Sequence, residues 1–282
     1  MRYPDVIIFG AAKGGTTSLY HYLNQHPQVF MSPAKETNFF ASLVGGDPYR
    51  RDSVKFPINT HEAYLGLFKD ATDQAILGEA SPLYLEHAGV PAVIRRWAPD
   101  AKLIAILREP VSRAVSSYAM RTRKGYEHRP IDEAIVPDSH YIQIGLYAKQ
   151  LRPYFTQFPA EQIKIFLYND LREDTNAVVR DVFNFVGVDP TVKIDTETKH
   201  NTGGYPRSAL VNRVLGNAQV REALMPYVPK AVRAPVKRLW AMNLGKTPEL
   251  SHEAKANLKA FVRDDVLALQ LMLSRDLSKW LH

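Results

Sequence analysis

Residues 5–23 constrain the fold of this chain more than any other stretch. Residues 6–9, Val-Ile-Ile-Phe, form a short apolar run that predicts a buried strand, and residues 18–23 begin an amphipathic helical pattern. The loop between them carries one cation, two glycines and three hydroxyl side chains: Lys13, Gly14, Gly15, Thr16, Thr17 and Ser18. A strand that leads through such a loop into a helix is a common unit of α/β folds.

This loop is suited to binding a phosphate or sulfate group. Backbone N–H groups and the positive end of the following helix converge there on one point. Gly14 and Gly15 let the backbone approach an anion closely, and Lys13 supplies a full charge. The lysine precedes the glycine pair, whereas in the usual P-loop, G-x-x-x-x-G-K-[ST], it follows the last glycine beside the hydroxyl that holds magnesium. A plain strand-to-helix turn with a hydroxyl cap is the alternative interpretation.

The composition excludes several classes of protein. The chain has 282 residues, 45% of them hydrophobic and 23% charged, as in an ordinary globular protein. It has no cysteine, which excludes disulfides and cysteine-ligated metal sites and is compatible with the cytoplasmic location that we expect. The first strand begins near residue 6 and no run of about 18 apolar residues follows, so we expect a soluble chain without a signal peptide or membrane span.

The net charge of +7 leaves the partner open. A basic excess serves nucleic acid, an anionic membrane surface or a polyanionic small ligand. Part of it lies in residues 229–240, where two prolines interrupt any long basic helix. We interpret this segment as a solvated connector, with a substrate or membrane-surface role as the alternative. Peripheral membrane contact therefore stays open, and the sequence does not indicate an oligomeric state.

The rest of the chain alternates strand and helix patterns. We expect further strands at residues 28–31, 102–107 and 162–168, and a strand followed by a turn at 75–82. We expect helices at 61–68, 90–97, 178–186 and 254–273, and a longer helical segment within 142–158. Residues 41–57 have no regular period and are interpreted as a substrate-binding flap; the glycine-rich, basic residues 199–208 are interpreted as a lid over a nucleotide. Because no repeat or clear linker divides the chain, we expect one domain over residues 1–282, with a mainly helical C-terminal part.

A second strand-to-helix junction carries an arginine. Arg108 directly follows the buried run of residues 102–107, and Pro110 fits the first turn of the next helix. Ser116 then lies about two helical turns farther along. Two such junctions at one sheet edge provide two anion sites, as a ligand with two separated anionic groups requires.

Two carboxylates fall where open α/β sheets place ligand chemistry. Glu36 follows Lys35 in the loop after residues 28–31, where a solvent-exposed ion pair is the simplest interpretation. Glu79 lies in the strand and turn of residues 75–82, and we give a structural or helix-capping role at least as much weight as a chemical one.

Four short motifs follow one another along the chain. They are Ala12-Lys-Gly-Gly-Thr-Thr-Ser-Leu19, Lys35-Glu-Thr-Asn-Phe-Phe40, Gly78-Glu-Ala-Ser-Pro82 and Leu107-Arg-Glu-Pro-Val-Ser-Arg-Ala-Val-Ser-Ser-Tyr118. The strand ending in Tyr168 and residues 203–207 and 276–280 extend the pattern. In this order and spacing the motifs resemble the sulfotransferase family, more closely its heparan-sulfate-type and bacterial branches. The resemblance implies a three-layer α/β sandwich around a parallel sheet, related to P-loop kinases, and 3′-phosphoadenosine 5′-phosphosulfate (PAPS) as sulfuryl donor.

The resemblance also implies roles for single residues. Lys13 to Ser18 match the loop that binds the 5′-phosphosulfate, and Arg108 and Ser116 match the pair that binds the 3′-phosphate. Glu36 matches the catalytic carboxylate. The later residues match positions near the adenine or in a loop that covers the nucleotide: Tyr168, Tyr205 and Arg207.

The expected reaction is in-line transfer of a sulfuryl group to a hydroxyl, less readily an amine, of a carbohydrate, lipid or other small molecule. Lys13 would stabilise charge on the leaving oxygen and Glu36 would take the acceptor's proton, with no metal or nucleic acid required. Ala80 stands where the heparan-sulfate-type enzymes often carry a lysine, which counts against a polyanionic carbohydrate acceptor. The alternatives are a magnesium-dependent nucleotide kinase or NTPase that uses the same loop, and an RNA-binding module that uses the basic excess.

Overall fold

The computed structural model describes residues 2–44, 58–198, 204–206 and 244–282. The chain divides into two compact units. The first comprises Met1–Arg108, Tyr147–Asn201 and Leu271–Ser274, and the second comprises Glu109–Leu146, Thr202–Gln270 and Arg275–His282. The expectation of one domain over the whole chain stays a prediction. None of the helices within the described ranges is both long and apolar enough to span a bilayer.

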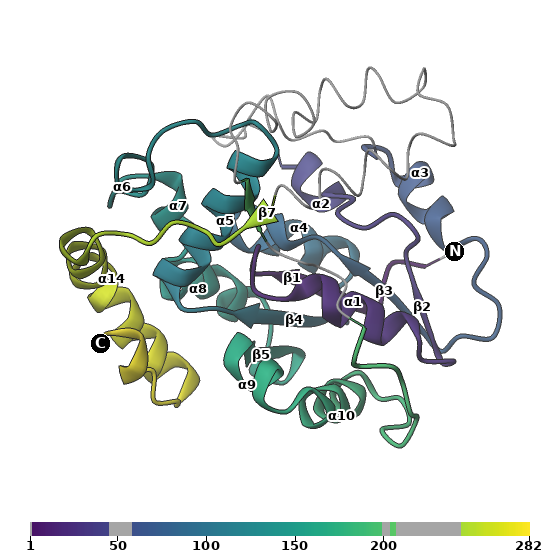
Figure 1. Cartoon of the computed structure of the whole chain (residues 1–282). Helices are drawn as coiled ribbons and strands as arrows, with labels where there is room; N and C mark the ends of the chain where they lie inside the picture. Colours follow the sequence, from purple (N-terminus) through teal and green to yellow (C-terminus); the bar gives the residue numbers. More distant parts are fainter. Residues whose placement is uncertain (1, 45–57, 199–203, 207–243) are drawn as a thin grey trace, which may run out of the picture. The chain divides into compact units, whose positions relative to one another are not determined.

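A five-stranded parallel sheet forms the centre of the first unit (Figure 1). Its strands are β1 (Val6–Gly10), β2 (Val29–Met31), β3 (Ile76–Ala80), β4 (Lys102–Leu107) and β5 (Ile163–Leu167). They lie in the order β2-β3-β1-β4-β5. Parallel strands are buried on both faces, which is why they appear in the sequence as continuous aliphatic runs.

The strand order creates a switch point beside β1. The chain leaves β1 for β2 on one side of the sheet and leaves β4 for β5 on the other, so the loops after these two adjacent strands diverge. Open α/β sheets bind ligands in the crevice at such a point, outside the carboxyl ends of the strands. The loop with Lys13 and the junction with Arg108 both begin there.

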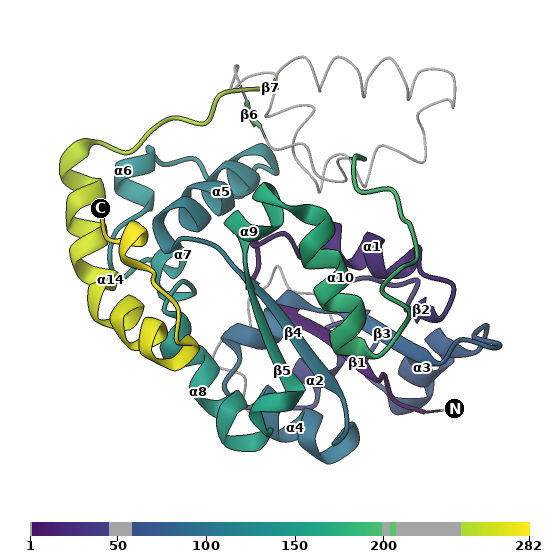
Figure 2. The same ribbon diagram turned by 90° about the horizontal axis from the view of Figure 1, so that it is seen from below.

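Helices cover both faces of the sheet. On one face, α1 (Thr16–Asn24) and α10 (Thr175–Val186) pack over Val6 and Ile8 (Figure 2). On the other face, α8 (Tyr147–Gln157) lies against Phe9, whose ring centroid is 4.3 Å from that of Tyr154. The other helices of this unit are α2 (Phe39–Ser42), α3 (His61–Leu65), α4 (Val90–Trp97) and α9 (Tyr168–Glu173). The three-layer α/β fold expected from the sequence is confirmed.

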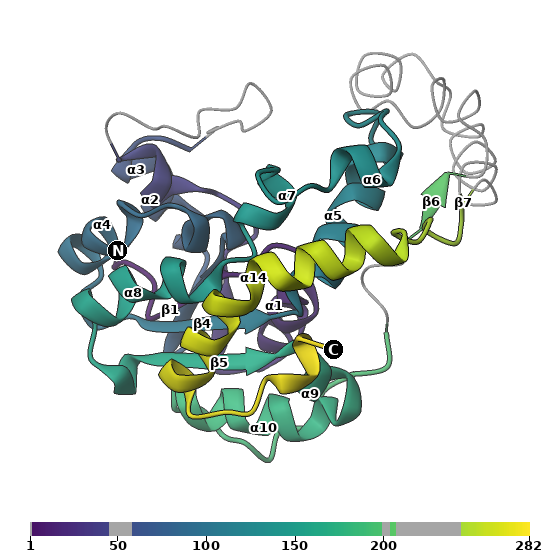
Figure 3. The ribbon, with the colours of Figure 1, turned by 90° about the vertical axis from the view of Figure 1, so that its left-hand side faces the viewer.

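The described part of the second unit is mainly helical. It contains α5 (Pro110–Arg123), α6 (Ile131–Ala134), α7 (His140–Gln143) and most of α14 (His252–Leu273), the long helix in Figure 3. β6 (Tyr205–Pro206) packs on α5 and forms a short antiparallel pair with β7 (Leu244–Gly245). Pro110 opens α5 as expected, and the Glu109 side chain caps it by accepting the N–H groups of Val111 and Ser112 at 2.8 and 2.6 Å.

The helical segment expected within residues 142–158 is confirmed as α8, and a break separates it from α7, which ends at Gln143. Gly145 lies in the break, where a Cβ would come within 3.1 Å of the Pro110 Cβ, so the chain needs a glycine that also weakens helix formation there. Tyr168 starts α9 rather than ending the preceding strand.

The expected flap, lid and basic connector fall largely on residues that the structure does not describe. Of residues 41–57 only 41–44 are described, and of residues 199–208 only 204–206. The connector at residues 229–240 lies wholly outside the described residues, as does Arg207.

Candidate functional site

The loop after β1 is shaped for a close approach of backbone to a ligand. A Cβ at Gly14 would lie 2.0 Å from the Ile106 carbonyl oxygen, so this position has room only for glycine. Gly15 precedes α1 in the left-handed region, with φ of 112°, and supplies no side-chain cap to the helix. The α1 N–H groups that lack intrahelical partners therefore lie beside the loop. Thr16, Thr17 and Ser18 form the first turn of α1.

Arg108 and Tyr168 come together at the ends of β4 and β5. They follow Leu107 and Leu167, which are paired in register across the two strands. The Arg108 guanidinium carbon lies 4.8 Å from the centroid of the Tyr168 ring. The Tyr147 hydroxyl fixes the backbone at the same place by donating to the Arg108 carbonyl oxygen at 2.8 Å.

The Tyr168 ring also lies against the loop after β1. A Cβ at Gly15 would be 3.3 Å from a ring carbon of Tyr168, tighter than an ordinary van der Waals contact. The structure therefore brings together the Lys13 loop, Arg108 and Tyr168 at the carboxyl edge of the sheet. The two cations and one aromatic face there are suited to an aromatic ligand that carries anionic groups.

Glu36 lies at the same sheet edge. Its N–H donates to the carbonyl oxygen of Ala80 at 2.8 Å, and Ala80 is paired with Ile8 across β3 and β1. The Glu36 side chain is 58% exposed and forms an ion pair with Lys35, with 2.7 Å between Oε1 and Nζ. The ion pair considered from the sequence is present. An exposed pair of this kind contributes only about 0–1 kcal/mol, so it restrains the carboxylate weakly.

Both residues expected to act in catalysis have a left-handed backbone. The φ angle is 70° at Lys13 and 60° at Glu36, and Asn38 close by has φ of 52°. This region costs a residue other than glycine about 1 kcal/mol or more, so the surrounding contacts must hold it. Backbone strain of this kind gathers at functional sites.

Glu79 is a buried structural carboxylate. Its side chain has 0% exposure and accepts hydrogen bonds from the hydroxyls of Thr37, Ser81, Tyr64 and Tyr84. Burial raises the pKa of Glu79 above its ordinary value, although these hydrogen bonds act in the opposite direction. Sequence reasoning did not identify Thr37, Tyr64 or Tyr84 as partners of Glu79. A tyrosine in an amphipathic pattern looks the same in the sequence whether its ring packs in the core or its hydroxyl binds a carboxylate, and a single threonine carries no signal of its own.

The remaining expected site residues lie in the second unit. Ser116 is half-buried on α5. Tyr205 on β6 stacks on Tyr118, with 6.0 Å between ring centroids and 15° between ring planes. Burial raises the pKa of Tyr118, and the neighbouring Tyr205 adds a smaller effect in the same direction. The shared role of Arg108 and Ser116 on one phosphate stays a prediction.

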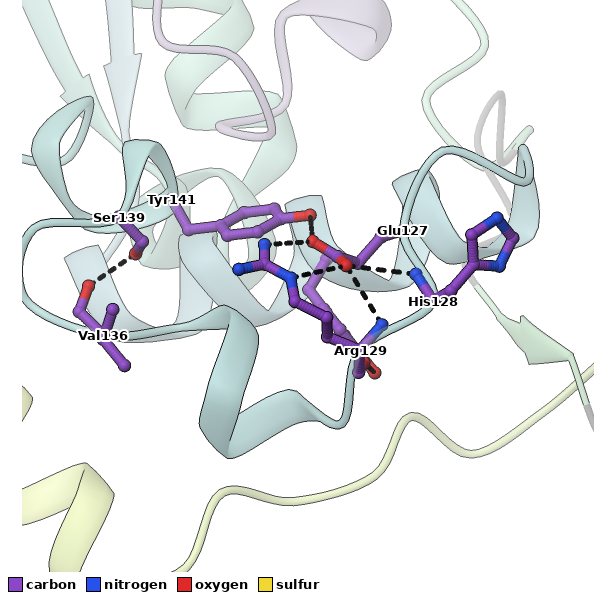
Figure 4. Close-up of polar contacts among 7 residues, drawn as sticks. Glu127, His128, Arg129, Val136, Ser139 and Tyr141 are labelled. Atoms are coloured by element: carbon purple, nitrogen blue, oxygen red, sulfur yellow. Dashed lines mark hydrogen bonds and ion pairs between the residues drawn. The ribbon is translucent and has the colours of Figure 1, made fainter.

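Glu127 organises the segment between α5 and α6, as Figure 4 shows. It accepts from Arg129 Nε and Nη2 at 3.0 and 2.7 Å and from the Tyr141 hydroxyl at 3.1 Å. The backbone N–H groups of His128 and Arg129 also donate to it, at 3.0 and 3.1 Å. Burial alone would raise the pKa of Glu127, but these hydrogen bonds outweigh it and lower the pKa to about 2.

No cluster of three or more potential metal-ligating side chains occurs among the described residues. The expectation of a reaction without metal stays a prediction.

Comparison with known proteins gives consistent matches. Residues 3–203 match the sulfotransferase domain family. Mouse heparan sulfate glucosamine 3-O-sulfotransferase 6 is 30% identical over 257 residues, which cover 85% of this chain and 68% of that protein. Mouse heparan sulfate glucosamine 3-O-sulfotransferase 3B1 is 29% identical over 218 residues, 73% of this chain and 51% of that protein, so the match spans about half the length of this relative. A solved sulfotransferase from Alicyclobacillus acidocaldarius is 28% identical over the full length of both chains, with a TM-score of 0.75.

Proposed function

This chain belongs to the sulfotransferase family, and on that premise we propose that it transfers a sulfuryl group from PAPS to an acceptor hydroxyl. The observation that carries the proposal is the grouping of the Lys13 loop, Arg108 and Tyr168 at one sheet edge, with Glu36 at the end of a neighbouring strand. The acceptor would be a carbohydrate, a lipid or another small molecule, and an amine would react less readily.

The residues at this edge fit the donor. The lack of room for any side chain at Gly14 brings backbone N–H groups within reach of the phosphosulfate, and the start of α1 adds a positive helix end. Lys13 adds a charge, and the hydroxyls of Thr16, Thr17 and Ser18 add donors. Arg108 and Ser116 would hold the 3′-phosphate. The Tyr168 ring would lie near the adenine, with Tyr205 and Arg207 in the segment that covers the nucleotide.

PAPS supplies an activated sulfuryl group, whose bond to the phosphate oxygen breaks as the acceptor oxygen bonds to sulfur. Lys13 and the start of α1 stabilise the negative charge on the leaving oxygen, a preorganised contribution of about 3–4 kcal/mol for a single good donor. Glu36 accepts the proton of the acceptor hydroxyl, which typically contributes about 10²- to 10⁴-fold to the rate. Arg108 and Ser116 orient the donor rather than take part in bond making.

We base the proposed acceptor class on the named relatives and on the residues around Glu36. The relatives named for heparan sulfate act on a glycan, which favours a sugar hydroxyl. The buried Ala80 carbonyl oxygen accepts from the Glu36 N–H, and the Ala80 side chain brings no cation to the acceptor side. We therefore favour a neutral or weakly charged sugar or small molecule over a polyanion. A kinase or NTPase is not favoured, because Lys13 precedes the glycines and does not adjoin a magnesium-binding hydroxyl as in a P-loop.

Calorimetric titration with PAP, the desulfated product of PAPS, tests the donor. We expect tight binding without magnesium, weakened at least tenfold in Arg108→Ala and unchanged in Arg152→Ala, an exposed arginine on α8. Equal binding of ATP with a strict requirement for magnesium would overturn the donor assignment. Transfer of radiolabelled sulfate from PAPS to a panel of neutral and anionic sugars, lipid alcohols and phenols then identifies the acceptor class.

A further inference from the structure

The buried Glu79 carboxylate has two hydroxyl donors on each oxygen. Thr37 Oγ1 and Ser81 Oγ donate to Oε2 at 2.8 and 2.9 Å. The hydroxyls of Tyr84 and Tyr64 donate to Oε1 at 2.8 and 3.0 Å. Four donors satisfy an ionised carboxylate that is removed from water.

Three of these hydroxyls also accept from consecutive backbone N–H groups. The pairs are Asn38 N–H to Ser81 Oγ at 3.1 Å, Phe39 N–H to Thr37 Oγ1 at 3.3 Å and Phe40 N–H to Tyr84 OH at 3.2 Å. We call the hydroxyls of Thr37, Ser81 and Tyr84 the hydroxyl relay. The Tyr64 hydroxyl is not part of the relay, because within the described residues its hydrogen bond goes to Glu79 and not to this backbone segment.

The hydrogen bonds of the relay all run one way, from the backbone N–H groups to the hydroxyls and from the hydroxyls to the Glu79 carboxylate. A hydroxyl carries one proton, and when that proton points at the carboxylate, the oxygen lone pairs are left for the backbone N–H groups. Phe39 and Phe40 begin α2, whose first N–H groups have no partners within the helix. The charge of Glu79 thus orients three hydroxyls, and these fix the start of α2. Hydrogen bonds in such a chain polarise and strengthen one another.

Residue 36 is held directly next to the relay. Thr37 is 1% exposed, whereas the neighbouring Glu36 side chain is 58% exposed. On one side, the N–H of Glu36 is fixed to the Ala80 carbonyl oxygen at 2.8 Å. On the other side, Thr37 is fixed to Glu79. The left-handed backbone at Glu36 lies between these attachment points, and that at Asn38 follows Thr37 directly.

We propose that Glu79 is a positioning residue for Glu36, because its buried carboxylate holds residues 36–40 through the hydroxyl relay in the conformation that presents the Glu36 carboxylate to the acceptor. The inference rests on the proposed role of Glu36 as general base. Glutamine cannot replace Glu79 in this role, although it has the same shape. On the Oε2 side its amide NH₂ would face Thr37 and Ser81, whose hydroxyls would have to turn their protons toward the Phe39 and Asn38 N–H groups. On the Oε1 side it would have the same effect on Tyr84 and the Phe40 N–H.

A pair of tyrosine variants tests the relay with matched chemistry. Tyr84→Phe and Tyr64→Phe each remove one buried hydroxyl that donates to Glu79 Oε1, but only Tyr84 also accepts the Phe40 N–H. We expect Tyr84→Phe to lower kcat at least tenfold and Tyr64→Phe to leave it within about twofold. The KM for PAPS and the affinity for PAP should stay unchanged in both. The assay measures transfer of labelled sulfate from PAPS to the acceptor panel. Without an acceptor, it measures hydrolysis of PAPS.

Double variants show whether Glu79 acts through Glu36. If it does, Glu79→Gln and Glu36→Gln each lower kcat, and the double variant is no slower than Glu36→Gln alone. Multiplied losses in the double variant, or equal kcat values in the two tyrosine variants, would overturn the inference while leaving the proposed function intact. Full turnover in Glu36→Gln would instead overturn the base assignment on which both depend. If Glu79→Gln does not fold, Tyr84→Phe combined with Glu36→Gln gives the same comparison.

Discussion

The guanidinium of Arg108 lies over the ring of Tyr168, with 4.8 Å between its central carbon and the ring centroid. The two residues directly follow Leu107 and Leu167, which face each other in the register of β4 and β5. The sheet therefore sets the position of the cation, because a shift of one residue in this pairing would separate the two side chains.

We expect the Tyr168 ring, rather than its hydroxyl, to support donor binding. Tyr168 is half-buried, and a cation over an aromatic face that solvent can reach is worth about 0.5–1 kcal/mol. Tyr168→Ala should therefore weaken PAP binding by about two- to fivefold. Tyr168→Phe keeps the ring and should bind PAP like the wild type. Calorimetric titration of both variants checks this, and an equal loss in both would assign the effect to the hydroxyl.

Gly14→Ala should prevent the loop after β1 from lying as close to β4 as it does in the structure. The added Cβ would meet the Ile106 carbonyl oxygen at 2.0 Å, and this backbone atom belongs to β4, which is paired with a strand on each side and cannot move aside. We expect a loss of at least tenfold in PAP affinity, together with a lower melting temperature. Gly66→Ala is the matched control, since nothing lies within 4 Å of a Cβ there, and it should be neutral or slightly stabilising. Unchanged PAP binding in Gly14→Ala would argue against a ligand at this loop.

Glu36→Gln should separate binding from chemistry. The side chain is exposed, so the variant should fold like the wild type and keep its affinity for PAP. Loss of a general base typically lowers the rate by about 10²- to 10⁴-fold. Single-turnover transfer from labelled PAPS measures this loss. Lys35→Met, which removes the ion-pair partner at 2.7 Å, is the control and should change the rate far less.

The Glu127 cluster should contribute stability that depends on pH. Its folded-state pKa of about 2 lies below the ordinary value of 4.5, so the contribution is present in full above about 4.5 and is lost as the pH falls toward 2. The melting temperature of Glu127→Gln should therefore be lower than that of the wild type at pH 7, and the difference should narrow between pH 4.5 and 3. Glu161→Gln, which changes an exposed carboxylate, serves as the control. A difference in melting temperature that stays the same across this pH range would mean that the charge of Glu127 does not contribute to stability.

The elements with strong local signals could be predicted from the sequence. The strand over residues 102–107 and the helix over residues 90–97 have the expected bounds, because an uninterrupted aliphatic run and a clear amphipathic period define them. The junctions after β1 and β4 were also predictable, since glycines, hydroxyls and Pro110 mark the start of the helices. Together they placed both loops at the carboxyl edge of the sheet, where the structure has them.

The parts that depend on long-range packing could not be predicted. The hydroxyls around Glu79 come from residues 37, 64, 81 and 84, and no period in the sequence connects them. The break at Gly145 depends on its packing against Pro110, which is distant in the sequence. The left-handed backbone at Lys13 and Glu36 was equally hidden, because lysine and glutamate carry no preference for it.

The left-handed backbone at Lys13 and Glu36 restricts which residues these two positions accept without a loss of stability. Glycine, asparagine and aspartate adopt it more readily than lysine or glutamate. A library randomised at positions 13 and 36 and selected only for folded protein should accordingly drift toward these three residues, whereas selection for turnover should return lysine and glutamate. The difference in residue frequencies between the two selected libraries would then measure how much stability each position gives up for activity.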